Sequence, residues 1–521
     1  KSRLSDDRLR EYAFLGRLKY CPPWCSGMET TKEGFSMASL PDSCHGRSFS
    51  FADPVAAFVS QPGLPFANVL SEEWIEGVFR KHDNIFGRVY TTSIVLWAFL
   101  SQVLRDGKEA SCRSAVGRIA SQLLLRSGRQ LDTDTRDYCR ARAKLSEAAL
   151  RELSCAIAAK SEETAPQQWL WLGRHVKLID GATFLMPDTP QNQKAYPQNP
   201  RQKPGIGFPI ARMVVVISLT TACVVDAAIG RYKGKETGET ALLRQLLSCF
   251  RRGDVAVADR FYGNYWMIAL LLQVGVNVCF RKHQLRKTDF RKGKRLGKND
   301  HLIAWSKPQR PSWMSQHMYA SLPEKLQLRE LKYVVVQPGR KHDPFVIITS
   351  LTETTGEQFV AADDIAELFL FRWNVELDIR SIKTHMNLQH LRCKSPEMVR
   401  REFWATMIAY NLIRTTAACA AVLHERIPRQ ISFVGACQYV LAVWDVLALA
   451  QGGQMHLDDY WRLRFQQIAD QIVADRPGRF EPRVLKKRWK NYHLMTQPRD
   501  TLRGKLRKGD NSFERRELSK R

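Results

Sequence analysis

Two short apolar runs that each end at an aspartate place the strongest limits on how this chain folds. His175 to Ile179 precedes Asp180, and Val255 to Ala258 precedes Asp259. Both runs have the length and composition of buried β-strands. A hairpin pattern and a helical pattern lie between them, and more helices and strands follow. This alternation predicts an α/β core.

The residues before this core have a different pattern. Ser71 is followed by two glutamates and then by apolar residues at helical spacing, which is typical of an N-capped helix. Further helical stretches cover about 92–104, 111–124 and 133–160. We therefore expect a helical domain with basic faces over residues 61–165. Residues 1–60 have no clear periodicity, and we expect a loose leader there.

The charge of the chain indicates a polyanionic partner. Lys and Arg number 80 against 52 Asp and Glu, which gives a formal net charge of +28. A surplus of this size favours nucleic acid. An anionic membrane would require a basic amphipathic helix or a lipid anchor, and the sequence shows neither. We expect no membrane span, and we expect the scattered cysteines to be free thiols of a reducing cytoplasm.

Two strongly basic segments each allow two interpretations. Arg281 to Lys298 contains nine basic residues and one acid, and Arg476 to Arg521 contains 16 basic and five acidic residues. The first is either a solvated loop or a DNA-contacting loop. The second is either a disordered solubilising tail or a nucleic-acid-binding tail.

A third segment has a more specific pattern, and it lies in a long helix that we expect to run from Asp363 or Asp364 to about His390. On an α-helix, Glu376 lies roughly 40° from Arg372, and Lys383 lies roughly 20° from Arg372, so the three residues form one stripe. Phe369 lies at the edge of this stripe, whereas Asp378 points elsewhere. The stripe is either an ordinary Arg–Glu pair or a metal ligand between two phosphate-binding cations.

Asp180, Asp259 and Glu376 together suit phosphodiester chemistry. Carboxylates at strand ends and on a rigid helix can hold hard divalent cations, which prefer oxygen ligands. Either aspartate alone can equally be a turn cap. Asp188 and Asp254 are competing acids, but neither ends a strand that would converge on the other.

These residues resemble the catalytic motifs of the DDE transposases of the IS-four family of bacterial insertion sequences. Arg372, Glu376 and Lys383 match the R-x3-E-x6-K part of the family's Y-R-E-K motif. Ile179 to Thr183 is similar to the first D-G-T segment, and Gly253 to Tyr262 is similar to the second catalytic segment. The likeness covers about residues 60–500, with its elements in the family order.

The resemblance implies a ribonuclease-H-like core over residues 166–280 and 361–450, interrupted by a β-rich insertion over residues 281–360. It also implies that residues 61–165 form an all-helical DNA-binding domain and that residues 451–521 form a basic C-terminal region.

The implied activity is cut-and-paste transposition. DNA is cleaved at the terminal inverted repeats, and the 3′-OH is then joined to target DNA. Asp180, Asp259 and Glu376 would be both catalytic and metal-binding, with two Mg²⁺ ions for which Mn²⁺ can substitute. The implied partners are double-stranded DNA and a second copy of the chain in a homodimer. The implied location is the bacterial cytoplasm, at the nucleoid.

Other residues are expected to contact DNA. Arg372 and Lys383 would grip phosphates, and Phe369 and Arg260 would also contact the DNA. Phe369 departs from the motif, because the family's tyrosine could donate a hydrogen bond and phenylalanine cannot. Trp305 or Trp313 could hold a flipped base, although packing is the more ordinary role of a tryptophan.

Two alternative functions stay open. One is a stand-alone metal-dependent nuclease with the same core, which does not require the chain outside that core. The other is a catalytically silent DNA-binding protein derived from a transposase, for which the intact acids are unexpected.

Overall fold

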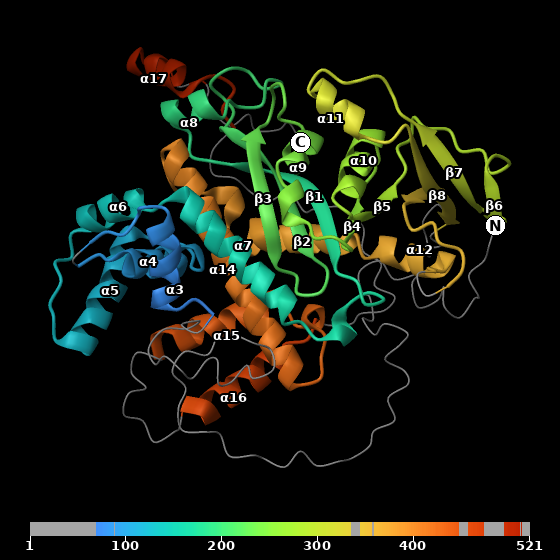
Figure 1. Cartoon of the computed structure of the whole chain (residues 1–521). Helices are drawn as coiled ribbons and strands as arrows, with labels where there is room; N and C mark the ends of the chain where they lie inside the picture. Colours follow the sequence, from blue (N-terminus) through green and yellow to red (C-terminus); the bar gives the residue numbers. More distant parts are fainter. Residues whose placement is uncertain are drawn as a thin grey trace, which may run out of the picture.

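A nine-stranded mixed sheet with helices on both faces forms the centre of the molecule (Figure 1). This computed structural model describes residues 69–87, 89–334, 344–356, 359–446, 457–473, 494–510 and 512. The predicted leader over residues 1–60 and most of the basic segment from Arg476 lie outside the described residues.

The first five strands form the part of the sheet that was expected for the core. Their bounds are β1 (Val176–Leu185), β2 (Ile210–Ser218), β3 (Val224–Arg231), β4 (Val255–Ala258) and β5 (Asn277–Arg281). Strands β1, β2 and β3 are an antiparallel meander, whereas β4 is parallel to β1 and β5 is parallel to β4. The β2–β3 pairing confirms the hairpin predicted from the sequence.

The remaining strands extend the same sheet. They are β6 (Lys294–Gly297), β7 (Asp300–Ser306), β8 (Lys325–Val334) and β9 (Pro344–Thr349), with α11 (Gln316–Ser321) between β7 and β8. Strand β9 pairs antiparallel with β5, so the sheet order is β3-β2-β1-β4-β5-β9-β8-β7-β6. The segment predicted as a β-rich insertion therefore adds its strands directly to the edge of the core.

Among the residues that the structure describes, five α-helices precede β1. They are α3 (Glu72–Lys81), α4 (Thr92–Val103), α5 (Cys112–Ser127), α6 (Thr135–Lys144) and α7 (Glu147–Glu163). The Ser71 side chain accepts a hydrogen bond from the backbone N–H of Trp74, which confirms the predicted cap. The single helix predicted over 133–160 is wrong, because Ser146 caps a new helix at the start of α7.

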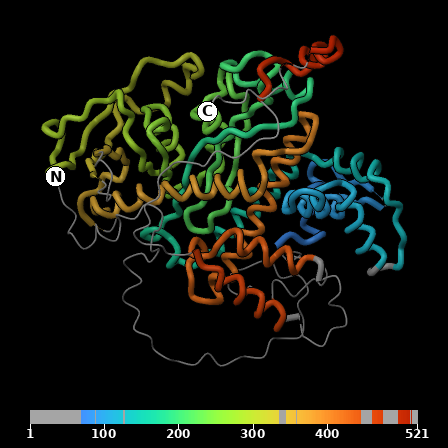
Figure 2. Tube along the Cα trace, turned by 180° about the vertical axis from the view of Figure 1, so that it is seen from behind, coloured from blue at the N-terminus to red at the C-terminus, as the bar shows by residue number. Residues whose placement is uncertain are grey.

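The longest helix, α14 (Pro396–Leu423), is buried behind the sheet. Figure 2 shows it beside the N-terminal helices, and its buried residues share one hydrophobic cluster with theirs. By length and composition α14 could cross a membrane, but 89% of its most apolar window is buried inside the protein. It is therefore the central core helix of this fold.

Shorter helices complete the two layers around the sheet. They are α8 (Pro190–Ala195), α9 (Glu239–Arg244), α10 (Tyr265–Gln273), α12 (Ala362–Leu370), α13 (Trp373–Arg380), α15 (Phe433–Val446), α16 (Leu457–Ala469) and α17 (Arg499–Arg507). Helices α9 and α10 cover one face with one hydrophobic cluster, and α13 and α14 cover the other face with a second cluster.

The long uninterrupted helix predicted from Asp363 to about His390 is wrong. The backbone N–H of Arg372 bonds to the carbonyl of Phe369, a tighter i−3 turn that separates α12 from α13. After α13, the N–H of Met386 bonds to the carbonyl of Ser381 and closes a π-helical turn over Ser381–His385. Such local departures from α-helical bonding often occur at functional sites.

A buried ion cluster holds α13 in place. Asp378 of α13 is 1% exposed. Its carboxylate accepts hydrogen bonds from Arg414 at 2.8 Å, from Arg429 at 2.9 Å and from the Tyr410 hydroxyl at 3.2 Å. Arg429 also donates to the carbonyls of Ser218 and Leu219 at the β2–β3 turn. The carboxylate that faces away from the predicted stripe is thus the anchor of its helix.

We predict that Asp378→Ala strongly destabilises the protein. The change leaves two buried guanidinium groups without their counter-charge, which costs roughly 3–5 kcal/mol of unfolding free energy. Urea unfolding would measure the loss. Asp137→Ala, which breaks an exposed pair with Arg140, should leave the midpoint unchanged. Equal midpoints for Asp378→Ala and the wild type would contradict the anchoring role.

Candidate active site

Asp180 lies in the middle of β1, and its predicted position at the end of a strand is wrong. The strand continues to Leu185 because β2 pairs with it along residues 177–185. On the other side of β1, however, β4 pairs only as far as Ile179 opposite Ala258. Asp180 is therefore the first residue of β1 that β4 leaves unpaired.

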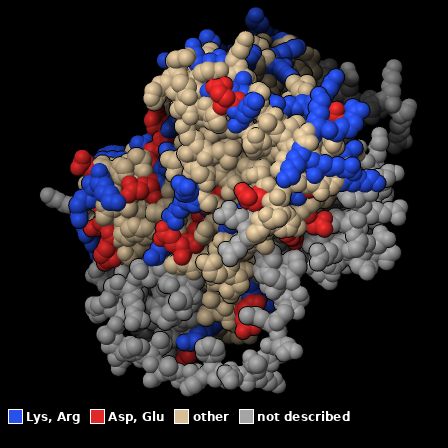
Figure 3. All heavy atoms as spheres, turned by 45° about the vertical axis from the view of Figure 1, so that its right-hand side comes forward, with Lys and Arg blue, Asp and Glu red and all other residues tan. Residues whose placement is uncertain are grey.

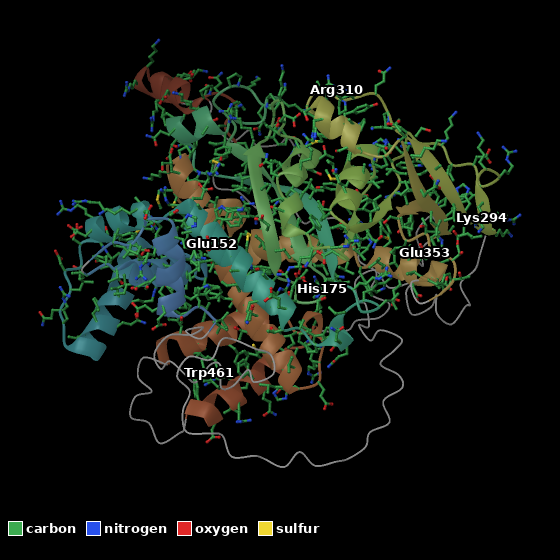
Figure 4. The ribbon with its side chains drawn as sticks, viewed as in Figure 1. Glu152, His175, Lys294, Arg310, Glu353 and Trp461 are labelled. Atoms are coloured by element: carbon green, nitrogen blue, oxygen red, sulfur yellow. The ribbon has the colours of Figure 1, made fainter. Side chains whose placement is uncertain are left out.

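The register places Asp259 beside Asp180. Ile179 is paired with Ala258, so the next residue on each parallel strand is an aspartate. Side chains alternate between the faces of a sheet, and Leu178 and Val257 both belong to the cluster beneath α13. Two residues along β1, Asp180 lies on that same face, and Asp259 directly follows the last residue of β4. His175, labelled in Figure 4, marks the opposite end, where β1 begins.

Glu376 comes to this face on α13, whose Val375 and Ile379 pack into the same cluster. Its Oε1 accepts a hydrogen bond from Nη1 of Arg372 at 3.0 Å, so the Arg–Glu pair of the ordinary interpretation is present. The Arg372 guanidinium also lies over the ring of Trp373, 4.7 Å from its centroid. Arg372 is buried at 8% exposure, whereas the Glu376 side chain is 42% exposed and can reach solvent.

The electrostatics of Asp180 link it to Glu376. The pKa of the Asp180 carboxyl is raised to about 6; burial is the main cause, and the negative charges of Glu239 and Glu376 act in the same direction. The Gly181 backbone N–H, at 2.8 Å, and the charge of Arg372 act in the opposite direction. The charge of Glu376 thus affects the pKa of Asp180, so the two residues lie near each other in the fold although they are far apart in the sequence.

Glu239 is a residue that the sequence interpretation missed. It is the first residue of α9, and its carboxyl group lies against Gly181, next to Asp180. An acid at the start of a helix is ordinary, because it complements the helix dipole. The sequence therefore gave little signal that this glutamate approaches β1.

The predicted DNA-contacting residues have different surroundings. Phe369 is 6% exposed and packs against Phe345, with ring centroids 5.2 Å apart, which leaves its ring little surface for DNA. Arg260 donates a hydrogen bond to Gln284 at 2.7 Å. Lys383 lies in the π-helical turn after α13 and is half-buried.

The two candidate tryptophans are packed. Trp305 is 5% exposed, and the Arg286 guanidinium lies 3.8 Å from its ring centroid. Trp313 packs against the cluster beneath α10, with Arg244 also 3.8 Å from its ring centroid. Both tryptophans thus pack against neighbouring side chains, which is the more ordinary of the two roles considered for them.

Asp180, Asp259 and Glu376 offer carboxylate oxygens, which are the ligands that hard divalent cations prefer. Within the described ranges, no three His, Cys, Asp or Glu side chains are already grouped at metal-ligand spacing. The Glu376 carboxylate is held by Arg372, and it would have to turn from that guanidinium to join Asp180.

We predict that Asp180→Asn stabilises the metal-free protein at pH 8 but not at pH 4. The carboxyl pKa is raised to about 6 in the folded protein, so the stability that Asp180 contributes when protonated is lost as the pH rises from about 4 through about 6. Asparagine stays neutral throughout. Urea midpoints measured in EDTA across this range would show the difference, and a constant difference at every pH would contradict it.

Comparison with known proteins identifies the domain that carries these acids. Residues 171–412 match the model of the transposase DDE domain. Transposase InsG for insertion sequence element IS4, from Escherichia coli, is 27% identical over 356 residues, which are 67% of this chain and 76% of InsG. Putative transposase InsZ, also from Escherichia coli, is 24% identical over 219 residues, 41% of this chain and 68% of InsZ.

A solved structure, the piggyBac transposase synaptic complex with hairpin DNA, covers 82% of this chain and 86% of its own at 10% identity. The TM-score of this match is 0.41. The family model and the likeness to InsG agree with the motif order along the chain. Residues 171–412 thus match a transposase DDE domain, and two thirds of the chain are similar to the transposase of insertion sequence element IS4.

Proposed function

We propose that this transposase cleaves DNA at the terminal inverted repeats of its element and joins the released 3′-OH to target DNA, with Asp180, Asp259 and Glu376 as its catalytic acids. The observation that carries the proposal is the convergence of these residues on one face of the sheet. In support, Asp180 and Asp259 each directly follow a member of the Ile179–Ala258 pair, and α13 packs its Val375 and Ile379 against the sheet face on which Leu178 lies.

The topology supports a ribonuclease-H-like core. Strands β3, β2 and β1 are antiparallel neighbours, and β4 and β5 continue the sheet in parallel with β1. The insertion expected for the family lies between β5 and α12. This arrangement provides a rigid framework for acids that come from two strands and a helix.

The acids would hold divalent cations, Mg²⁺ or Mn²⁺. Two such ions, when bound, activate the attacking oxygen and stabilise the leaving oxygen. The chain's own residues position the DNA. Arg372 stacks on Trp373 and pairs with Glu376, so its guanidinium remains close to the reacting phosphate. Lys383, one turn beyond α13, adds a second cation for the DNA backbone.

The surface charge supports double-stranded DNA as the partner. Figure 3 shows Lys and Arg side chains gathered over the upper and right-hand parts of one face. Lys294 on the outer strand β6 is exposed, as Figure 4 shows, and the side chain of Arg291 is 91% exposed. Because two element ends must be held together, we propose a homodimer. We propose the bacterial cytoplasm, at the nucleoid, as its location.

We predict that Asp180→Ala, Asp259→Ala and Glu376→Ala each reduce cleavage at least about a thousandfold, because several kcal/mol of transition-state stabilisation depend on the bound cations. The assay is incubation of the full chain with Mg²⁺ or Mn²⁺ and a duplex that carries the element ends. Asp188→Ala is the matched control, because Asp188 bonds to Gln193 in a loop and should not alter cleavage.

DNA binding should survive in all four variants and should weaken steeply with salt. Normal cleavage by Asp259→Ala would show that the assignment of the acids is wrong. A wild-type enzyme that cuts but never joins the 3′-OH to a second duplex would favour the stand-alone nuclease. Binding without any cleavage would favour the silent DNA-binding protein.

A further inference from the structure

A basic surface lies at the end of the sheet where β1 ends at Leu185 and β4 ends before Asp259. It consists of exposed cations from α8, from the loop between α8 and β2, and from α17: Lys194, Arg201, Lys203, Arg499, Arg503 and Arg507. We call it the α8–α17 surface. Its two parts are far apart in the sequence, so only the fold brings them together.

A direct contact joins α17 to the loop. Pro498, the residue before α17, packs on Gly205, because a Cβ atom placed on Gly205 would lie 3.0 Å from Cγ of Pro498. Figure 1 and Figure 2 both show α17, in red, beside the segment that contains α8. Leu502 and Lys505 of α17 are half-buried, so another face of this helix is turned to the protein. The cations of the loop and of the helix therefore belong to one surface.

The arginines of α17 form one stripe. Arg499, Arg503 and Arg507 are four residues apart, so each step turns about 40° around the helix and advances about 6 Å. All three residues are exposed. Arg503 makes a salt bridge of 3.0 Å with Asp500, but both side chains are largely exposed, so the pair is weak. The stripe therefore offers guanidinium groups to a partner along most of the helix.

The cations of the α8–α17 surface have few counter-charges. Among the residues that the structure describes, Arg503 is the only one of the six in a salt bridge. Cations gathered in this way attract a polyanion. A helix that lies on a membrane presents a large apolar face, whereas Leu506 is the one strongly exposed apolar residue of α17. Charge and shape therefore favour DNA over an anionic membrane.

The surface lies within reach of a duplex at the candidate site. Strand β1 continues from Asp180 to Leu185, which is about 17 Å at roughly 3.3 Å per residue. The loop with Arg201 follows at this end, and Asp259 lies at the same end because β4 is parallel to β1. A duplex rises about 3.4 Å per base pair. About five base pairs therefore cover the distance from the acids to the α8–α17 surface.

We propose that the α8–α17 surface binds the phosphate backbone of the target duplex. The proposal rests on the proposed function, because it adds a contact for the DNA that receives the 3′-OH. Contacts of Arg and Lys with phosphates hold DNA without reading its sequence. The element ends must be recognised by sequence, whereas a target can be held by its backbone alone. A surface of exposed cations therefore suits the target.

The first test measures binding of the full chain to a duplex without element ends, by fluorescence anisotropy at several salt concentrations. Arg499→Gln/Arg507→Gln should weaken binding at low salt. It should also reduce the steepness of log K against log salt by about 2, because each lost phosphate contact reduces it by about 1. Arg201→Gln/Lys203→Gln should have the same effect, because the loop belongs to the same surface.

The matched control is Arg251→Gln/Arg252→Gln. It removes two exposed arginines from the turn before β4, at the opposite end of the sheet, and should have the salt dependence of the wild type. Asp500→Asn should change binding in the opposite direction, because it frees Arg503 from its salt bridge and strengthens binding to the plain duplex. Thermal unfolding of each variant establishes that the fold is retained.

The second test separates the target from the element ends. For the same variants, we would measure cleavage of a duplex that carries the element ends, and the joining of pre-cleaved ends to a plain duplex. In the two double variants of the α8–α17 surface, joining should fall in proportion to the affinity for the plain duplex. Cleavage without target should stay at the wild-type rate, because none of the four residues belongs to the candidate active site.

The outcomes separate this inference from the proposed function. Wild-type binding and joining in both surface variants would overturn the inference alone. An equal fall in cleavage and joining would assign the surface to the element ends and contradict the target assignment. A wild type that binds the plain duplex but neither cleaves nor joins ends would overturn the proposed function, and the target assignment with it. Reduced joining with normal cleavage, and an unchanged control, supports the inference.

Discussion

The geometry of the candidate site depends on the ion cluster around the buried carboxylate of Asp378. This carboxylate binds Arg414 of α14 and Arg429, and Arg429 in turn holds the carbonyls at the β2–β3 turn. Helix α13 is thereby joined both to the central helix and to the sheet. Glu376 lies two residues before Asp378, so the same cluster fixes where Glu376 meets β1.

The unequal pairing of β1 provides the other half of the site. Strand β2 pairs along its whole length, whereas β4 ends opposite Ile179. The backbone of β1 therefore holds Asp180 at the point where β4 has ended and Asp259 follows. The partial burial that raises the Asp180 pKa to about 6 follows from this position under α13. Folding thus confines an acid where its charge is unfavourable unless a cation neutralises it.

Local patterns predicted much of this arrangement. The sequence predicted three local features, because neighbouring residues determine them: the Ser71 helix cap, the β2–β3 hairpin and the short strand before Asp259. The sequence did not predict that β1 continues past Asp180, because the pairing with β2 maintains this part of the strand. The breaks around α13 and the approach of Glu239 to Gly181 also depend on tertiary packing. The motif therefore predicts Glu376 as a site residue, and the fold gives the surroundings of the acids proposed to act with it.

The most direct test of the central claim is a crystal structure of the protein with cleaved element-end DNA and Mn²⁺, measured at the manganese absorption edge. The claim that β1, β4 and α13 assemble one metal site predicts anomalous peaks within coordination distance of Asp180, Asp259 and Glu376, with Glu376 turned from Arg372. Peaks at other carboxylates, or a Glu376 still paired with Arg372 beside a DNA end bound elsewhere, would contradict it.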